Sequence, residues 1–177
     1  FARRQRQMCI RDRLSAFQRA GGVVAKSSLE CIEDAQFIIT MLPQSSDVYE
    51  TLINNNVTAN SFLPETIFID MTTSHPYTTD KLYKYLSEIN IEMLDAPVGR
   101  TSTMAASGKL LIMVGGTKTT LINAEPILNL MGSTIVHCGG AGMGYKTSPG
   151  TSPIPRWPMG SASAQNCHQR SGVGTGC

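Results

Sequence analysis

The chain has 177 residues, of which 41% are hydrophobic and 16% charged, a composition typical of a folded domain and unlike that of a disordered or fibrous chain. No apolar run approaches the ~20 residues of a membrane-spanning helix, and residues 1–13 lack the apolar core of a secretory signal. The net charge of +2 hides five arginines within residues 1–13 and an acidic excess in residues 14–147, so we expect neither a nucleic-acid nor a membrane partner.

The five cysteines are scattered along the chain, and no two of them form a Cys-x-x-Cys pair. An odd number without paired spacing argues against a disulfide framework and against a zinc site. Cys31 and Cys138 lie in apolar surroundings in the sequence, so we expect both to be small core residues. This cysteine usage is compatible with the reducing cytoplasm, and no metal site is predicted.

Strand-like and helix-like patterns alternate through the middle of the chain. Continuous apolar runs at 36–43, 66–73, 91–98, 109–116 and 133–140 predict strands that are covered on both faces. Residues 45–53, 74–89 and 117–132 have the apolar spacing of helices, with Leu82, Tyr85, Leu86 and Ile89 on one face of the second. A kink at Pro126 is an open possibility in the third helix.

This alternation predicts the α/β class, with a Rossmann-like open and mostly parallel sheet. Ligands bind such sheets beyond the carboxyl ends of their strands. Three strand ends are therefore candidate ligand loops, namely residues 41–43, 72–73 and 99–102.

The two ends of the chain do not share this pattern. Residues 148–177 are rich in proline, glycine and serine, and residues 1–13 have neither helical nor strand periodicity. We expect residues 14–147 to form a partial dinucleotide-binding domain, residues 1–13 to be a non-native leader, and residues 148–177 to be a frameshifted or disordered tail. Genuine flexible tails are the alternative.

Five motifs resemble the β-hydroxyacid dehydrogenase family in order and spacing: FIITMLP, IDMTTSHP, DAPVGRTS, GKLLIMVGG and GGAGMG. The resemblance implies a cytoplasmic, homo-oligomeric oxidoreductase that uses NAD or NADP, with NADH favoured. By the same resemblance Leu42, Pro43 and Thr73 line the cofactor groove. The alternatives are core packing for Leu42 and a helix N-cap for Thr73.

Where most of the family continues DAPV with Ser-Gly-Gly, this chain has Gly99, Arg100, Thr101 and Ser102. That variant is similar to the sulfolactaldehyde reductase branch and implies a small anionic substrate bound by these four residues. A permanently charged guanidinium with two hydroxyls suits a three-oxygen sulfonate. A carboxylate, as in 3-hydroxyisobutyrate or tartronate semialdehyde, is the alternative, and so is a solvated turn in which Arg100 binds nothing.

Two parts of the family pattern are absent. No Gly-x-Gly-x-x-Gly turn precedes Leu14, and Ser148 occupies the position of the family's catalytic lysine. We therefore assign no catalytic residue, expect a domain that is incomplete at its N-terminus and lacks the all-α C-terminal domain, and expect no turnover from this polypeptide. A non-catalytic module that binds nucleotide or anion stays open.

The remaining polar residues of the pattern are given structural roles. We expect Asp70 and Asp95 to cap loop amides, and we assign no function to His75 and His137. A sheet without its first strands exposes an unpaired edge, which predicts poor solubility.

Overall fold

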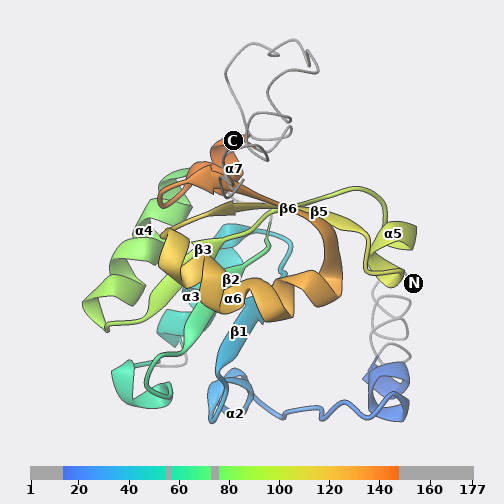
Figure 1. The fold of residues 1–177 in the computed structure, drawn as a ribbon. Coiled ribbons are helices and arrows are strands. Elements are labelled where there is room, and N and C mark those ends of the chain that lie inside the picture. The colour runs from blue at the N-terminus through green and yellow to red at the C-terminus, as the bar shows by residue number, and fades with distance from the viewer. Residues whose placement is uncertain (1–13, 55–56, 73–75, 148–177) are drawn as a thin grey trace, which may run out of the picture.

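The centre of the protein is an open sheet with helices on both faces (Figure 1). The structure is a computed structural model that describes residues 14–54, 57–72 and 76–147. The strands are β1 (Phe37–Thr40), β2 (Ile67–Asp70), β3 (Glu92–Asp95), β4 (Val98–Gly99), β5 (Leu110–Gly115) and β6 (Gly132–Gly139). β1, β2 and β3 pair in parallel, β5 runs antiparallel to β3 and β4, and β6 is parallel to β5. The predicted Rossmann-like, mostly parallel sheet is confirmed.

β3 and β4 are two parts of one long strand. Asp95 pairs with Gly115, and Gly99 pairs with Leu111, so the register against β5 continues unchanged across the gap at 96–97. A proline at position 97 has no N–H for the ladder, which explains the interruption. β4 therefore carries the chain beyond the level at which β1 and β2 end.

The helices confirm the three long predictions and add short ones that were not predicted. They are α2 (Ser28–Ile32), α3 (Ser45–Asn54), α4 (Pro76–Glu88), α5 (Ser102–Ala106), α6 (Lys118–Met131) and α7 (Met143–Thr147), together with the 3-10 turn η1 (Ala59–Ser61) and a helical stretch at 14–19. α2, α5 and α7 have five residues each, too few to produce a helical period in the sequence. α6 continues through Pro126.

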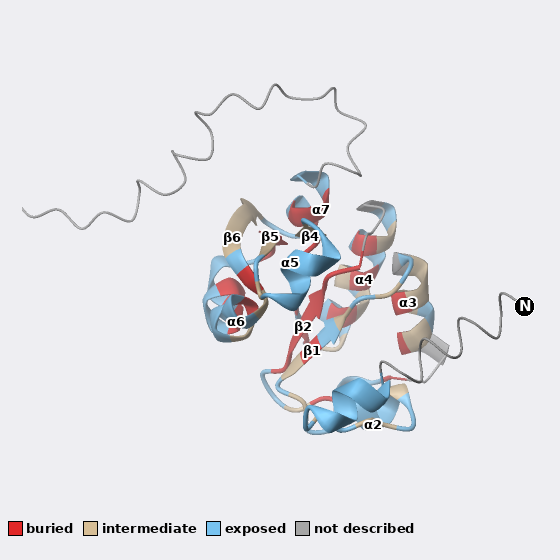
Figure 2. Ribbon diagram, turned by 90° about the vertical axis from the view of Figure 1, so that its right-hand side faces the viewer, coloured by how far each residue is buried: buried red, intermediate tan, exposed pale blue. Residues whose placement is uncertain are grey.

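Two hydrophobic clusters hold the layers together, one on each face of the sheet. Ile38, Phe68 and Met93 lie in register on adjacent strands and pack with α3 and α4. On the opposite face, Leu94 and the apolar side of α6 form the second cluster. In Figure 2 the buried residues concentrate in the strands and in the inner sides of these helices, whereas α2 is largely exposed.

Among the described residues, β1 is an edge strand that pairs only with β2. Ile39 on this strand is 39% exposed, and Met41, which directly follows the strand, is 64% exposed. The predicted unpaired edge is therefore present in the described part of the chain.

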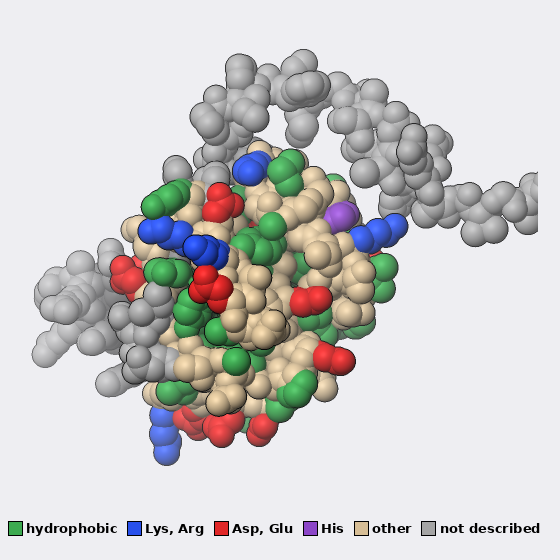
Figure 3. Space-filling view, turned by 90° about the vertical axis from the view of Figure 1, so that its left-hand side faces the viewer, with side chains coloured by type: hydrophobic (Ala, Val, Ile, Leu, Met, Phe, Trp, Pro, Cys, Tyr) green, Lys and Arg blue, Asp and Glu red, His purple; other side chains and the backbone are tan. Residues whose placement is uncertain are grey.

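The surface of the described part is mixed in charge. Figure 3 shows Lys and Arg side chains interspersed with Asp and Glu on the face that lies on the left of Figure 1. No helix within 14–54, 57–72 or 76–147 is both long enough and apolar enough to cross a bilayer.

Candidate functional site

A row of four residues in register marks the carboxyl edge of the sheet: Thr40 on β1, Asp70 on β2, Asp95 on β3 and Gly115 on β5. We call these four residues the carboxyl-edge row. Both aspartates are fully buried. A buried carboxylate needs hydrogen-bond donors to replace the water it loses.

Asp70 is held by its neighbours on the chain and on β1. The Thr40 hydroxyl donates to Asp70 Oδ1 at 2.8 Å, and the Thr72 amide donates to the same oxygen at 3.0 Å. Asp70 Oδ2 is buried and accepts no hydrogen bond from the described residues. The predicted role of Asp70, capping a loop amide, is confirmed.

Asp95 accepts three hydrogen bonds, one from α4 and two from the segment 142–145. The Gly142 amide donates to Oδ1 at 2.8 Å, the Tyr83 hydroxyl lies 3.0 Å from the same oxygen, and the Tyr145 amide donates to Oδ2 at 3.0 Å. Burial raises the pKa of Asp95, and the two amides and the Tyr83 hydroxyl oppose that rise only in part. Its predicted capping role is likewise confirmed.

Two tyrosines face this row, of which Tyr145 is fully buried and Tyr83 is half-buried. Burial, and then the negative charge of Asp95, raises the pKa of Tyr83 far above its usual value. Burial and the charge of Asp70 do the same for Tyr145, whose hydroxyl donates to the Asp70 carbonyl at 2.9 Å. Both hydroxyls therefore stay protonated and serve as donors. The sequence reasoning missed both residues, although Tyr145 is the first aromatic residue after Tyr85 and directly follows a glycine turn.

Two of the predicted cofactor residues, Leu42 and Pro43, lie where β1 leaves the sheet. Leu42 is half-buried and its amide donates to the Thr72 hydroxyl at 3.0 Å, while Pro43 is exposed. Leu42 also packs against the cluster beneath α3, so its alternative role in the core is real. Thr73 and His75 lie outside the described residues, and α4 begins just after them at Pro76.

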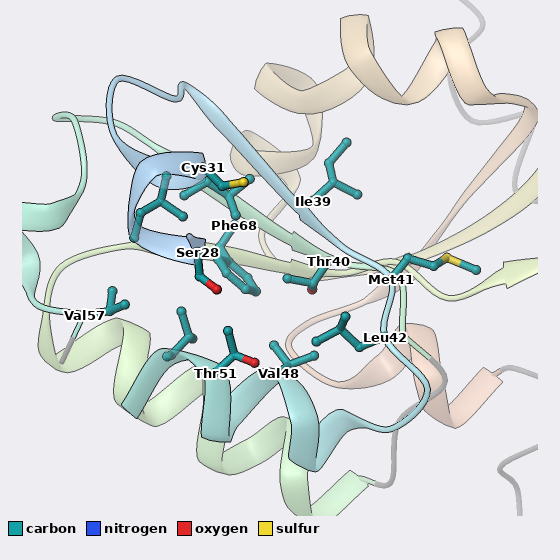
Figure 4. A pocket seen from close by; sticks show the side chains of 13 residues that line it. Ser28, Cys31, Ile39, Thr40, Met41, Leu42, Val48, Thr51, Val57 and Phe68 are labelled. Carbon is teal, nitrogen blue, oxygen red and sulfur yellow. The ribbon is translucent and has the colours of Figure 1, made fainter. Parts of the chain in front are cut away.

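An apolar cavity of about 390 Å³ lies between β1, α2 and α3. Figure 4 shows Leu42, Val48 and Phe68 lining it, with Cys31 contributed by α2.

The prediction that Cys31 is a core residue is wrong, because it is exposed. On the short helix α2 the neighbouring Ile32 takes the core-facing position and is only 5% exposed. Cys138 is half-buried.

The predicted substrate residues follow the end of β4. Arg100 has φ of +85°, a left-handed conformation that is rare for a residue with a side chain. Thr101 is the N-cap of α5 and Ser102 is its first residue, and Arg100, Thr101 and Ser102 are all exposed. Because Gly99 lies four residues beyond Asp95 on the same continuous strand, this loop extends roughly 13 Å past the carboxyl-edge row.

The Arg100 side chain reaches toward β6. One terminal nitrogen donates to the Lys109 carbonyl at 2.8 Å and to the Ser133 hydroxyl at 3.2 Å, and the other donates to the Thr134 hydroxyl at 3.3 Å. The structure thus brings Arg100, Thr101 and Ser102 together at one end of the sheet. It does not bring the guanidinium to Leu42, since β1 and β6 lie toward opposite edges of the sheet.

Other polar candidates have local partners. A ring nitrogen of His137 lies 2.9 Å from the Gly116 carbonyl, which agrees with the structural role that we expected for it. Within the described residues, no group of three or more His, Cys, Asp or Glu side chains is arranged to hold a metal ion. Ser148, at the position of the family's lysine, lies outside them.

Residues 8–140 match the family described as the NAD-binding domain of 6-phosphogluconate dehydrogenase. Over 126 residues the chain is 40% identical to the 3-sulfolactaldehyde reductase of Escherichia coli, covering 71% of this chain and 42% of that protein. Over 163 residues it is 34% identical to the mitochondrial 3-hydroxyisobutyrate dehydrogenase of Mus musculus, covering 92% of this chain and 49% of that protein.

Among solved structures, a 3-hydroxyisobutyrate dehydrogenase of Mycobacterium tuberculosis with L-serine is similar in fold. The TM-score is 0.66 at 34% identity, covering 72% of this chain and 43% of that one. The chain therefore spans less than half the length of these relatives.

Proposed function

Because the chain belongs to the family of the NAD-binding domain of 6-phosphogluconate dehydrogenase, we propose that it is part of an NAD(P)-dependent reductase of 3-sulfolactaldehyde. The product of that reduction is 2,3-dihydroxypropane-1-sulfonate. The observation that carries the proposal is Arg100, which stands with two hydroxyl residues at the exposed end of β4 in a chain that is 40% identical to a 3-sulfolactaldehyde reductase.

In this proposal the loop after β4 binds the sulfonate. A sulfonate has three acceptor oxygens and a charge that does not titrate in the working range, and a guanidinium matches it with a rigid fork of five donors. Three hydrogen bonds from that fork go to Lys109, Ser133 and Thr134. Sulfonate binding exchanges some of these exposed contacts with neutral acceptors for hydrogen bonds in which the donor and the acceptor are both charged. The Thr101 and Ser102 hydroxyls add neutral donors.

The residues that would hold the dinucleotide are Leu42, Pro43 and Thr73. The described part of this segment fits such a group, because half-buried Leu42 and exposed Pro43 form an apolar wall at the carboxyl edge. When bound, the nicotinamide supplies the hydride for the aldehyde carbon. The choice between NAD and NADP belongs to residues that this pattern does not identify, and we keep NADH as the favoured donor.

Reduction of a carboxylated semialdehyde is the second candidate. One observation favours it: the Arg100 guanidinium already has partners within the chain, whereas the Thr101 and Ser102 side chains are exposed. A carboxylate needs fewer donors than a sulfonate, and hydroxyl and amide groups can supply them. The 34% identity to 3-hydroxyisobutyrate dehydrogenase agrees with this alternative.

A chimera separates the two candidates. Residues 14–147 replace the equivalent segment of the Escherichia coli 3-sulfolactaldehyde reductase, and kcat/KM is measured with 3-sulfolactaldehyde, tartronate semialdehyde and the oxidised form of 3-hydroxyisobutyrate. We expect 3-sulfolactaldehyde to be the preferred substrate. A preference for either carboxylated aldehyde would replace the proposal by its alternative. The 177-residue chain alone, to which we assign no catalytic residue, is expected to show no turnover.

A further inference from the structure

α7 lies directly on the sheet, with backbone against backbone. A Cβ added at Gly144 would lie 2.6 Å from the carbonyl oxygens of both Asp95 and Met113, so no larger residue fits there without a shift. The turn before α7 also depends on glycine, because Gly142 has φ of +77°. The chain passes through α7 as it leaves the sheet (Figure 1).

A helix of this length does not keep its place by its own hydrogen bonds. α7 has five residues, so most of its backbone donors have no intrahelical acceptor. Two amides of this segment, those of Gly142 and Tyr145, donate instead to the two oxygens of Asp95. The Tyr145 hydroxyl adds an anchor on the Asp70 carbonyl.

Asp95 also connects this helix to α4, which lies on the same face of the sheet. Its Oδ1 also faces the Tyr83 hydroxyl of α4, and the same hydroxyl accepts from the Asp95 amide at 3.2 Å. One fully buried carboxylate is therefore shared by β3, α4 and α7. All of the groups that donate to this carboxylate are neutral, so it orients them through hydrogen bonds to its two oxygens and forms no ion pair with them.

We propose that Asp95 is a positioning residue whose carboxylate fixes where α7 lies on the carboxyl edge of the sheet. It thereby fixes the point and direction in which the chain leaves the described domain. The assignment rests on the proposed function in one respect, that in an intact reductase the segment that follows this helix serves the reaction. Asp95 is itself fully buried, and its side chain bonds Tyr83, Gly142 and Tyr145.

Substitution of Asp95 by Asn tests this on the 177-residue chain without substrate. An amide nitrogen in place of Oδ2 turns its N–H groups toward the Tyr145 N–H, so one acceptor is lost while the shape is kept. We compare amide hydrogen-exchange rates in Asp95→Asn with those in the wild type. The increase in rate for residues 142–147 should be at least tenfold larger than the increase in β5. Asp34→Asn is the matched control, since Asp34 is exposed and its φ of 60° suits Asn.

Gly144→Ala gives a second, steric route to the same effect. It leaves the carboxylate in place but pushes α7 from the sheet, so the same amides should lose protection. Gly140→Ala is its control, because a Cβ at Gly140 meets no atom within 4 Å. Equal loss of protection in residues 142–147 and in β5 would show a global effect only and would overturn the proposal.

The pH dependence of amide chemical shifts in the wild-type chain provides a readout that needs no variant. The Gly142 and Tyr145 amide protons should titrate together, with one midpoint above the ordinary aspartate value of about 3.9. Absence of a shared titration would also overturn the assignment. Because no readout involves substrate, a failure of the reductase proposal leaves these results interpretable, and the reverse holds too.

Discussion

Replacement of Tyr83 by Phe removes a single oxygen from a buried network without creating a large cavity. That oxygen lies 3.0 Å from Asp95 Oδ1 and 3.2 Å from the Gly115 carbonyl, and it accepts the Asp95 amide at 3.2 Å. One hydroxyl proton serves one of the two oxygens at a time. The variant therefore takes a donor from a buried carboxylate and an acceptor from a buried N–H.

The hydrogen bonds that each variant removes determine the expected loss in the free energy of unfolding, and we compare Tyr83→Phe with Tyr145→Phe. A buried N–H left without a partner costs about 1–3 kcal/mol, and a hydrogen bond to a charged group contributes about 1.5–3 kcal/mol, so we expect Tyr83→Phe to lower the free energy of unfolding by roughly 3 kcal/mol. Tyr145→Phe removes one donor from the Asp70 carbonyl, which keeps the Ala96 amide at 2.8 Å. We expect that loss to be about 1 kcal/mol.

Urea denaturation followed by far-ultraviolet circular dichroism measures both losses. Tyr77→Phe is the control, because Tyr77 is 64% exposed and a phenyl ring there still lies beneath the Lys81 ammonium. We expect the order of stability to be Tyr77→Phe, then Tyr145→Phe, then Tyr83→Phe as the least stable. If Tyr83→Phe is no less stable than Tyr145→Phe, the hydroxyl of Tyr83 does not have the role we describe.

Three other predictions concern Asp95, the exposed strand β1 and Cys31. Because burial raises the pKa of Asp95, its contribution to the unfolding free energy is greatest below about pH 3.9 and is lost as the pH rises through its folded value. The stability of the wild type relative to Asp95→Asn should therefore fall as the pH rises above about 4 in urea titrations, and a constant difference would contradict this. Ile39→Lys places a charge on the exposed edge of β1 and should raise the soluble fraction after expression, with no change as the contrary result. Peptide mapping after brief alkylation should show Cys31 labelled faster than half-buried Cys138, and equal rates would contradict the exposure of Cys31.

The long elements of the fold could be predicted from the sequence because each has a clear apolar period or run. Leu82 and Leu86, which share the predicted face of α4, are both fully buried. The capping roles of Asp70 and Asp95 were also predictable, since an aspartate that ends a buried strand must find donors in the next loop. The donors themselves were not, because Gly142 and Tyr145 lie 47 and 50 residues away from Asp95 in the chain.

The features that escaped prediction depend on short helices and on long-range contacts. α7 is too short to have a period, and its position follows from Gly144 and Asp95. The direction of the Arg100 side chain depends on Ser133 and Thr134, which are 33 and 34 residues distant. Thr73 and Ser148 lie outside the described residues, so their predicted roles stay predictions.

The most direct test of the proposed function is the substrate preference of Arg100→Ala in the chimera described above. We predict that kcat/KM for 3-sulfolactaldehyde falls ~10- to 100-fold, as expected for the loss of a charged hydrogen-bonding group, while kcat/KM for tartronate semialdehyde changes much less. Arg19→Ala removes an exposed arginine that is distant from Arg100 in the sequence, and it should change neither value. An unchanged kcat/KM for 3-sulfolactaldehyde in Arg100→Ala would contradict the assignment of Arg100 to the substrate.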